Sequence, residues 1–121
     1  MATRYALDTN VGLYLLGGRL LEPLPVGEFC ISVITEMEML SYSAISEAEV
    51  LRIQQFLSQV TVIGLHENIK NIAIALRKKY RLKLPDAIVC ATAWSMNAVL
   101  MSNDAQLKRV TEISVETVQI Q

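Results

Sequence analysis

The chain has 121 residues, 52% of them hydrophobic, and a net charge of −1. This length and composition predict one domain, residues 1–121, with a substantial core and no disordered tail. The charge excludes a general attraction to nucleic acid, so any such binding must rely on a local patch. There is no apolar stretch of roughly 20 residues and no signal-peptide pattern, so we expect a cytoplasmic protein that does not bind membranes.

The first predicted elements are a strand and a helix joined by a polar turn. Tyr5-Ala6-Leu7 suits a buried strand, and Asp8-Thr9-Asn10 supplies capping side chains before a helix at 11–16, which Gly17-Gly18 should end. In an α/β protein, Asp8 then lies at the carboxyl edge of a strand, where open parallel sheets bind ligands. An acid there is either a functional group or a helix cap. For this Asp taken alone, a cap is the better interpretation.

The rest of the chain continues the alternation of strands and helices. Strands are predicted at 28–31, 60–63, 99–101 and, at an edge, 114–118; helices are predicted at 33–42, 46–58, 66–80, from about 85 to 94, and 105–110. Short apolar strands between helices indicate a mostly parallel sheet covered on both faces. Right-handed crossovers then make a doubly wound, three-layer domain the simplest architecture.

The aspartates are few and similarly placed. The chain has twelve acidic residues, of which only Asp8, Asp86 and Asp104 are Asp. Asp86 follows Pro85 at a predicted helix start, and Asp104 comes soon after the strand at 99–101. Three helix caps would also explain this pattern. If the first and fourth strands are neighbours, however, Asp8 and Asp104 face one another across the ligand crevice.

Several classes of site are excluded by residues that the chain lacks. The single histidine, His66, has no partner for two-histidine acid–base catalysis, and we interpret it as a surface or capping residue. There is no GxSxG, phosphate loop, GxGxxG or zinc spacing. Cys30 and Cys90 are predicted to be buried, reduced thiols. Residues 9–85 contain no Asp, which excludes a receiver domain, and Asn10 stands where a dehalogenase-like phosphatase needs a second Asp.

Oxygen-ligand chemistry remains, carried by Asp8, Asp86 and Asp104 with Glu38 as the best-placed glutamate. Converging carboxylates repel one another, which is costly unless a divalent cation neutralises them. Mg²⁺ or Mn²⁺ suits such a donor set and acts on phosphates. The residues therefore predict a metal-dependent phosphodiesterase.

A basic run precedes Asp86. Its five members, from a chain with eleven cations, are Arg77, Lys78, Lys79, Arg81 and Lys83. On this feature alone, a solvated helix end that complements the helix dipole is the better interpretation. Beside a metal site, the same run becomes a candidate contact for a phosphate backbone.

With these residues in view, the chain resembles PIN-domain nucleases, and more narrowly the VapC-type toxins of bacterial toxin-antitoxin pairs. The match runs nearly end to end. Its landmarks are the segments at 6–10 (Ala-Leu-Asp-Thr-Asn), 31–40 (Ile-Ser-Val-Ile-Thr-Glu-Met-Glu-Met-Leu), 84–88 (Leu-Pro-Asp-Ala-Ile) and 100–104 (Leu-Met-Ser-Asn-Asp). Each landmark is short, and the specificity lies in finding all four in order.

The resemblance implies a site and a fold. The acidic quartet of the family falls on Asp8, Glu38, Asp86 and Asp104, with Thr9, Asn10 and Ser102 in supporting positions. Glu38 is preferred to Glu36 because the family's glutamate lies three residues after a threonine, here Thr35. Leu107 departs from the aromatic residue found in many relatives. The implied fold is a Rossmann-like α/β/α PIN domain with sheet order 3-2-1-4-5.

The resemblance also implies partners and a reaction. The substrate would be RNA, with tRNA among the candidates, the cofactor Mg²⁺ or Mn²⁺, and the assembly a homodimer. A cognate antitoxin would inhibit by placing a C-terminal segment in the acidic groove. We expect an activated water to attack the phosphate and leave a 5′-phosphate and a 3′-hydroxyl. Two alternatives stay open: a non-catalytic RNA- or protein-binding PIN module, and an RNA-processing nuclease without a toxin role.

Overall fold

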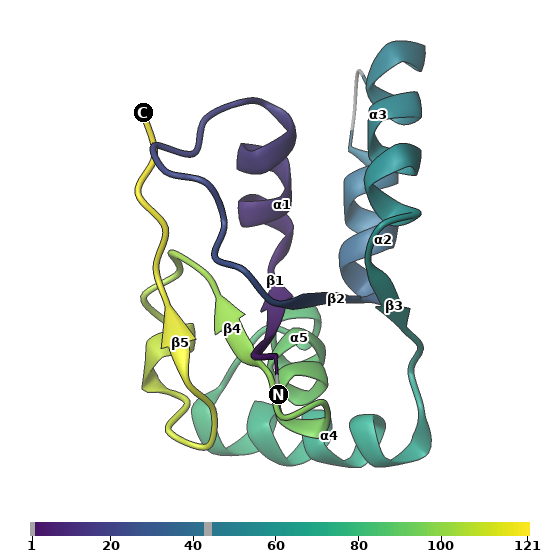
Figure 1. Ribbon diagram of the computed structural model, residues 1–121. Coiled ribbons are helices and arrows are strands. Elements are labelled where there is room, and N and C mark those ends of the chain that lie inside the picture. The colour runs from purple at the N-terminus through teal and green to yellow at the C-terminus, as the bar shows by residue number, and fades with distance from the viewer. Residues whose placement is uncertain (1, 43–44) are drawn as a thin grey trace.

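The computed structural model describes residues 2–42 and 45–121, and its centre is a five-stranded sheet (Figure 1). The strands are β1 (Arg4–Leu7), β2 (Glu28–Ser32), β3 (Thr61–Ile63), β4 (Val99–Met101) and β5 (Val115–Glu116). They pair in the order β3-β2-β1-β4-β5, and every pair is parallel. The predicted sheet order is confirmed.

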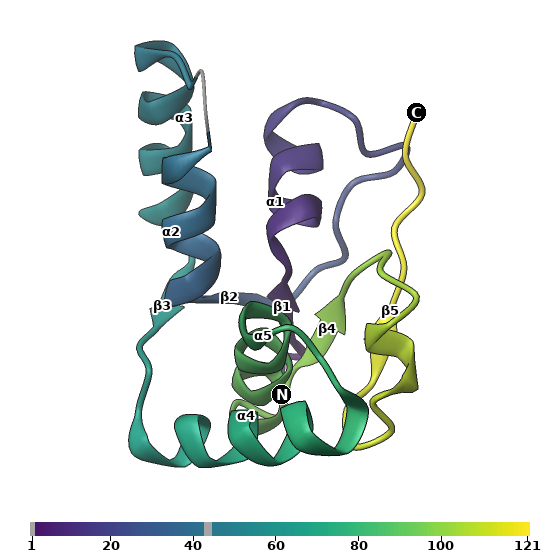
Figure 2. The same ribbon diagram turned by 180° about the vertical axis from the view of Figure 1, so that it is seen from behind.

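Helices cover both faces of the sheet. They are α1 (Thr9–Leu16), α2 (Val33–Ser41), α3 (Glu47–Leu57), α4 (Glu67–Tyr80) and α5 (Leu84–Ser95), with a 3₁₀ turn, η1 (Leu107–Arg109). Neighbouring strand residues alternate between two cores, as the pleat requires: Ala6 and Leu100 pack with α4 and α5, whereas Leu7 and Met101 pack with α1, α2 and α3. Figure 2 shows α4 and α5 together on one side. The three-layer prediction is confirmed.

Local capping explains where the helices begin. Asp8 Oδ1 accepts a hydrogen bond of 2.8 Å from the Val11 N–H, so α1 begins at Thr9, earlier than the predicted 11–16. Ser32 Oγ caps α2 in the same way, and Ser46 forms the predicted capping box at the start of α3. Two strands therefore end directly in helix caps at one edge of the sheet.

Two predictions near the C-terminus need correction. The helix predicted at 105–110 is only the short η1, because the backbone here closes into i→i+3 bonds, from the Leu107 N–H to the Asp104 carbonyl and from the Val110 N–H to the Leu107 carbonyl. The strand predicted at 114–118 is reduced to β5, because after Glu116 the chain pairs with side chains and with a distant loop. It does lie at the sheet edge, as predicted.

Other single-residue predictions are confirmed. His66 is exposed and occupies the N-cap position of α4, although its side chain accepts no capping hydrogen bond. Cys30 and Cys90 are buried and free. Within the described ranges, no helix combines the length and the apolar character needed to cross a membrane.

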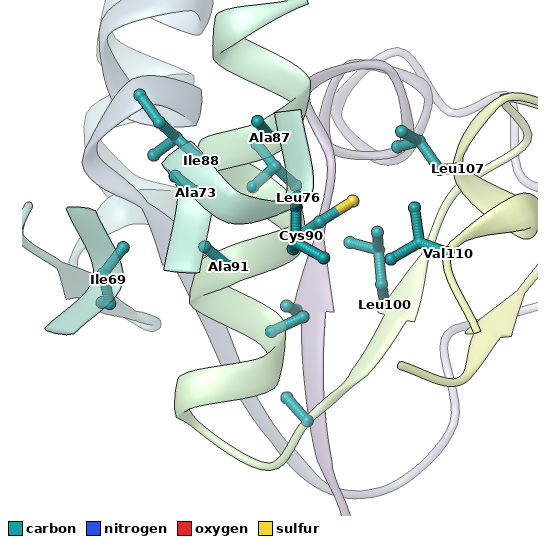
Figure 3. Close-up of a cluster of buried hydrophobic side chains, with 14 of the residues drawn as sticks. Ile69, Ala73, Leu76, Ala87, Ile88, Cys90, Ala91, Leu100, Leu107 and Val110 are labelled. Atoms are coloured by element: carbon teal, nitrogen blue, oxygen red, sulfur yellow. The ribbon is translucent and has the colours of Figure 1, made fainter. Parts of the chain in front are cut away.

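The largest contact between helices joins α4 to α5 and fixes the helix that carries Asp86. Ile69, Ala73 and Leu76 follow the predicted stripe on α4 and are buried, whereas Tyr80 is only half-buried. They meet a nearly continuous buried segment of α5, residues 87–93 (Figure 3). Trp94, just beyond this segment, is 43% exposed.

Leu76→Ala is expected to lower the free energy of unfolding by about 2–5 kcal/mol, because it leaves a cavity between α4 and α5. Leu76 is 1% exposed, whereas Ile74 on the same helix is 50% exposed. Ile74→Ala should therefore change stability by less than about 0.5 kcal/mol. Urea unfolding of both variants measures this; equal losses would contradict the packing described.

Candidate active site

Asp8 lies at the end of β1, at the point where the sheet meets α1. Its backbone N–H donates to the Met101 carbonyl at 3.2 Å, which ties the end of β1 to β4. Asp8 is buried, with 8% of the residue exposed. Burial raises the pKa of this carboxyl above its ordinary value, although bonds from Ser102 and the Val11 N–H lower it in part. Nearby carboxylates raise it again.

Glu38 approaches the same edge from α2. It is exposed, and its Oε1 accepts a hydrogen bond of 2.6 Å from Thr9 Oγ1, across from the start of α1. The negative charge of Glu38 contributes to the raised pKa of both Asp8 and Asp86. One turn earlier on α2, Thr35 is fully buried and its hydroxyl has no hydrogen-bond partner among the described residues.

Asp86 and Asp104 complete the group. Asp86 is half-buried in the first turn of α5, and burial raises its pKa first, followed by the charges of Asp104 and Glu38; Lys83 acts in the opposite direction. Asp104 is exposed in the turn after β4, where its N–H donates to Ser102 Oγ at 3.1 Å. Asp8, Glu38, Asp86 and Asp104 therefore come from four segments and act electrostatically on one another at the carboxyl edge of the sheet.

The buried thiol nearest this group is inert. Burial raises the pKa of Cys90 to about 12, and the charges of Asp86, Asp104 and Asp8 add to the shift. A thiol with so high a pKa is not a nucleophile at neutral pH. The chemistry of this edge is therefore that of its oxygen groups.

The family model for the PIN domain matches residues 5–113, a range that includes all four carboxylates. The chain belongs to the PIN-domain family. A curated relative, Ribonuclease VapC2 of Haemophilus influenzae, is 30% identical, and the match covers 93% of this chain and 96% of the relative. The predicted family is thus confirmed.

Solved structures agree with this assignment. A toxin-antitoxin complex from Klebsiella pneumoniae is similar to this chain with a TM-score of 0.77 and 31% identity, over 90% of this chain and 94% of that one. VapBC2 from Rickettsia felis, bound to a DNA fragment from its promoter, gives a TM-score of 0.81 at 20% identity over 97% and 100%. The second likeness supports the fold alone.

The carboxylates of this PIN domain suit a hard divalent cation by their chemistry, because they are oxygen donors that repel one another. The side chains as they lie do not form a complete ligand shell: across residues 2–42 and 45–121, no three His, Cys, Asp or Glu side chains are arranged to hold a metal ion. Mg²⁺ commonly binds through one or two carboxylates and retains several waters, so a shell of three is not required.

The other predicted supporting residues differ in their contacts. Thr9 holds Glu38, and the Ser102 hydroxyl, which is fully buried, lies between the Asp8 carboxyl and the Asp104 backbone. Asn10 is exposed in the first turn of α1. Thr9 and Ser102 thus contact the acidic group, whereas the Asn10 side chain makes no hydrogen bond to it among the described residues.

The basic run of this PIN domain is divided by the fold. The charge of Lys83, at the N-cap of α5, lowers the pKa of Asp86 in part, whereas Lys79 forms an ion pair with Glu112 at 2.9 Å. Arg77 and Lys78 are exposed in the last turn of α4, and Arg81 follows as its C-cap.

Two further cations join this run from η1. Arg109 donates to the Tyr80 carbonyl at 3.0 Å, and Lys108 beside it is exposed. The sequence analysis missed both, because two cations about 25 residues further along the chain carry no signal of their own. We define the basic flank as Arg77, Lys78, Arg81, Lys83, Lys108 and Arg109. Between residues 68 and 111, the only acidic residues are Asp86 and Asp104.

Asp86→Asn is expected to stabilise the protein at pH 7 in EDTA. Burial and repulsion raise the pKa of Asp86 in the folded state. A carboxyl with a higher pKa in the folded than in the unfolded state contributes stability below its unfolded pKa, and this contribution is lost as the pH rises through the folded pKa. At pH 7 the ionised Asp86 therefore destabilises the folded protein, and Asn does not. The variant should melt at a higher temperature at pH 7, and the difference should shrink toward pH 4.

Glu47→Gln provides the matched control for this measurement. Glu47 is an exposed carboxylate in the first turn of α3, so its replacement also removes a favourable interaction with a helix dipole. It should not raise the melting temperature. A difference between Asp86→Asn and the unsubstituted protein that is independent of pH would contradict the account.

Proposed function

We propose that this PIN domain is an endoribonuclease that hydrolyses RNA phosphodiester bonds. The observation that carries the proposal is the gathering of Asp8, Glu38, Asp86 and Asp104 from four segments at one edge of the sheet, where burial and then the neighbouring negative charges raise the pKa values of Asp8 and Asp86. Such a group is costly to maintain for structure alone, because each like charge destabilises the others. The curated relatives are ribonucleases, which supports the same activity.

The cofactor we propose is Mg²⁺ or Mn²⁺, held by Asp8, Asp86 and Asp104 together with Glu38. When bound, such an ion supplies positive charge that stabilises a phosphate oxygen and lowers the pKa of water. Asp8 forms the buried floor of the site, and Ser102 fixes its position relative to Asp104. Thr9 holds Glu38 toward solvent, where a substrate would enter.

The products we propose are a 5′-phosphate and a 3′-hydroxyl, with water as the nucleophile. The alternative route, attack by the ribose 2′-hydroxyl, is typically assisted by histidines. The single histidine, His66, lies at the start of α4, where Asn68 bonds to Ser95 at the opposite end of α5 from Asp86. The catalytic groups available are therefore carboxylates.

The RNA backbone, we propose, runs over the basic flank. The flank begins at Lys83 beside Asp86 and continues through the end of α4 to η1. Lysine and arginine side chains placed in this way contact phosphates without regard to base sequence. The flank would thus position the chain while the acidic group acts on one bond.

The cellular role we propose is that of a toxin controlled by a cognate antitoxin protein, in the cytoplasm, with residues 1–121 acting as a single domain within a homodimer. Support for the partner comes from similar solved structures, which are toxin-antitoxin or VapBC complexes. The target RNA, including tRNA, is to be found by experiment.

Asp86→Asn is expected to abolish cleavage while the fold is retained. The purified protein is incubated with total tRNA and a generic single-stranded RNA in Mg²⁺, Mn²⁺ or EDTA. The cleavage rate should fall at least about 100-fold, because replacing even a hydrogen-bond partner of a metal ligand typically lowers metal affinity or activity by roughly 10- to 100-fold. Full activity in the variant would contradict the site assignment, and no cleavage by the well-folded, antitoxin-free protein would favour a binding module.

Glu38→Gln and Glu36→Gln form a matched pair on α2 that accompanies this assay. Both replace a carboxylate by an amide on the same helix, yet only Glu38 is bonded to Thr9. We expect Glu38→Gln to lose activity and Glu36→Gln to keep it. The reverse result would show that Glu36, and not Glu38, is the glutamate of the site.

Lys108→Ala is expected to raise KM for RNA and to lower the salt dependence of binding by about 0.7 in the log–log slope, the value for one phosphate contact on a single strand. The control is Lys70→Ala, which removes an exposed lysine paired with Glu67 in the first half of α4. Each lysine substitution is introduced into the Asp86→Asn protein, and binding of a fluorescent RNA is measured over a range of salt concentrations. Equal effects of the two substitutions would contradict the role proposed for the basic flank.

A further inference from the structure

Asn103, between Ser102 and Asp104, holds the backbone of a distant residue with both ends of its side chain. Its Oδ1 accepts a hydrogen bond of 2.8 Å from the Val118 N–H, and its Nδ2 donates one of 2.9 Å to the Val118 carbonyl. A side-chain amide that contacts both backbone groups of one residue reproduces the pairing of a neighbouring strand. We call these two bonds the Asn103 clamp.

The clamp is found where the β4–β5 ladder stops. The strands pair as far as Met101 and Glu116, and the Ser102 N–H still donates to the Glu116 carbonyl at 2.9 Å. The backbone of β4 then turns away: the Asp104 N–H bonds to Ser102 Oγ. A backbone that turns cannot continue a ladder, so the Asn103 side chain provides the next rung in its place.

The segment held by the clamp is itself well anchored. Val118 packs against the core cluster that contains Met101. Beyond it, the Leu21 N–H donates to the Gln119 carbonyl and the Gln121 N–H donates to the Arg19 carbonyl, each at 2.9 Å. The C-terminal strap, residues 117–121, therefore lies fixed between the turn after β4 and the loop after α1.

Asp104 depends on this anchorage more than the other carboxylates do. Asp8 and Asp86 lie in the first turns of helices or at their caps, which fix their backbones. Asp104 lies exposed in a turn. Among the described residues, the hydrogen bonds of Asp104 that involve a side chain join it only to its near neighbours Ser102 and Gln106. Two long-range side-chain contacts hold this turn among the described residues: the Ser102 hydroxyl bonds to the Asp8 carboxyl, and the Asn103 clamp ties the turn to residue 118.

We propose that Asn103 is a positioning residue, which places the Asp104 carboxylate in the acidic group by bracing its turn against the C-terminal strap. The consequence for catalysis rests on the proposed function; the brace itself does not. Asn103 needs no contact with RNA or metal for this role. Loss of the clamp loosens the turn and moves the Asp104 carboxylate relative to Asp8 and Asp86.

The test compares Asn103→Ala with Gln121→Ala in the full chain. Both substitutions remove an amide that ties the strap down, but Gln121 Nε2 bonds to the Gly18 carbonyl, at the opposite end from Asp104. The primary measurement is amide hydrogen exchange at Gln106, whose N–H is held by Asp104 Oδ1 at 2.9 Å. That amide reports the position of the carboxylate without metal, RNA or activity.

In Asn103→Ala, exchange at the Gln106 amide should rise about tenfold, the factor that corresponds to one or two net hydrogen bonds. RNA cleavage should show kcat reduced by about tenfold or more with KM nearly unchanged, because a displaced catalytic group affects the transition state. Gln121→Ala should leave both quantities near those of the unsubstituted protein. If Asn103→Ala does not fold, exchange at the Gln106 amide is measured in Asn103→Asp instead. This variant keeps the bond from the Val118 N–H.

Faster exchange at Val118 with unchanged exchange at Gln106 would overturn the proposal, because the clamp would then hold the strap alone. Equal changes in kcat for the two variants would overturn it as well. Absence of RNA cleavage by the unsubstituted protein contradicts the proposed function, and the exchange at Gln106 then still decides whether the clamp positions Asp104.

Discussion

The confinement of partly buried, mutually repelling carboxylates at the edge of a parallel sheet is the constraint on which the candidate site depends. The sheet order places β1 beside β4, so the residues that follow them, Asp8 and Asp104, share one edge. Burial is the larger cause of the raised pKa values of Asp8 and Asp86, and the neighbouring negative charges add to it. The starts of α1 and α5 offer a partial positive charge at these positions, which offsets some of the cost. A bound divalent cation would offset the remainder, which makes the site a natural one for phosphate chemistry.

Charge is distributed unevenly over the rest of the molecule. Residues 20–51, which include β2 and α2, contain acids and no Lys or Arg, whereas residues 68–111 contain many cations and only the two site aspartates. The fold brings η1 to the end of α4 through the Arg109 contact and so enlarges the positive region beside the site. A weakly negative protein can in this way present a local surface that attracts RNA. Net charge alone would not reveal it.

Much of this architecture follows from local sequence. The alternation of short apolar strands with capped helices predicted the three layers, and the Ser46 capping box was found as predicted. Two features were not predictable in the same way. The segment expected as a helix at 105–110 forms only a short 3₁₀ turn. Arg109 bonds to the carbonyl of Tyr80, 29 residues earlier in the chain, and local sequence carries no signal for such a contact. The choice of Glu38 over Glu36 came from family resemblance, because its partner, Thr9, lies on another helix.

The chemistry of the RNA ends tests the central claim most directly. A short 5′-labelled RNA is cleaved by the purified protein in Mn²⁺, and the fragments are identified by mass spectrometry. Hydrolysis by water at a carboxylate site predicts a 3′-hydroxyl on the upstream fragment and a 5′-phosphate on the downstream one. A 2′,3′-cyclic phosphate would show that the ribose hydroxyl is the nucleophile, and it would contradict the catalytic role proposed for Asp8, Glu38, Asp86 and Asp104.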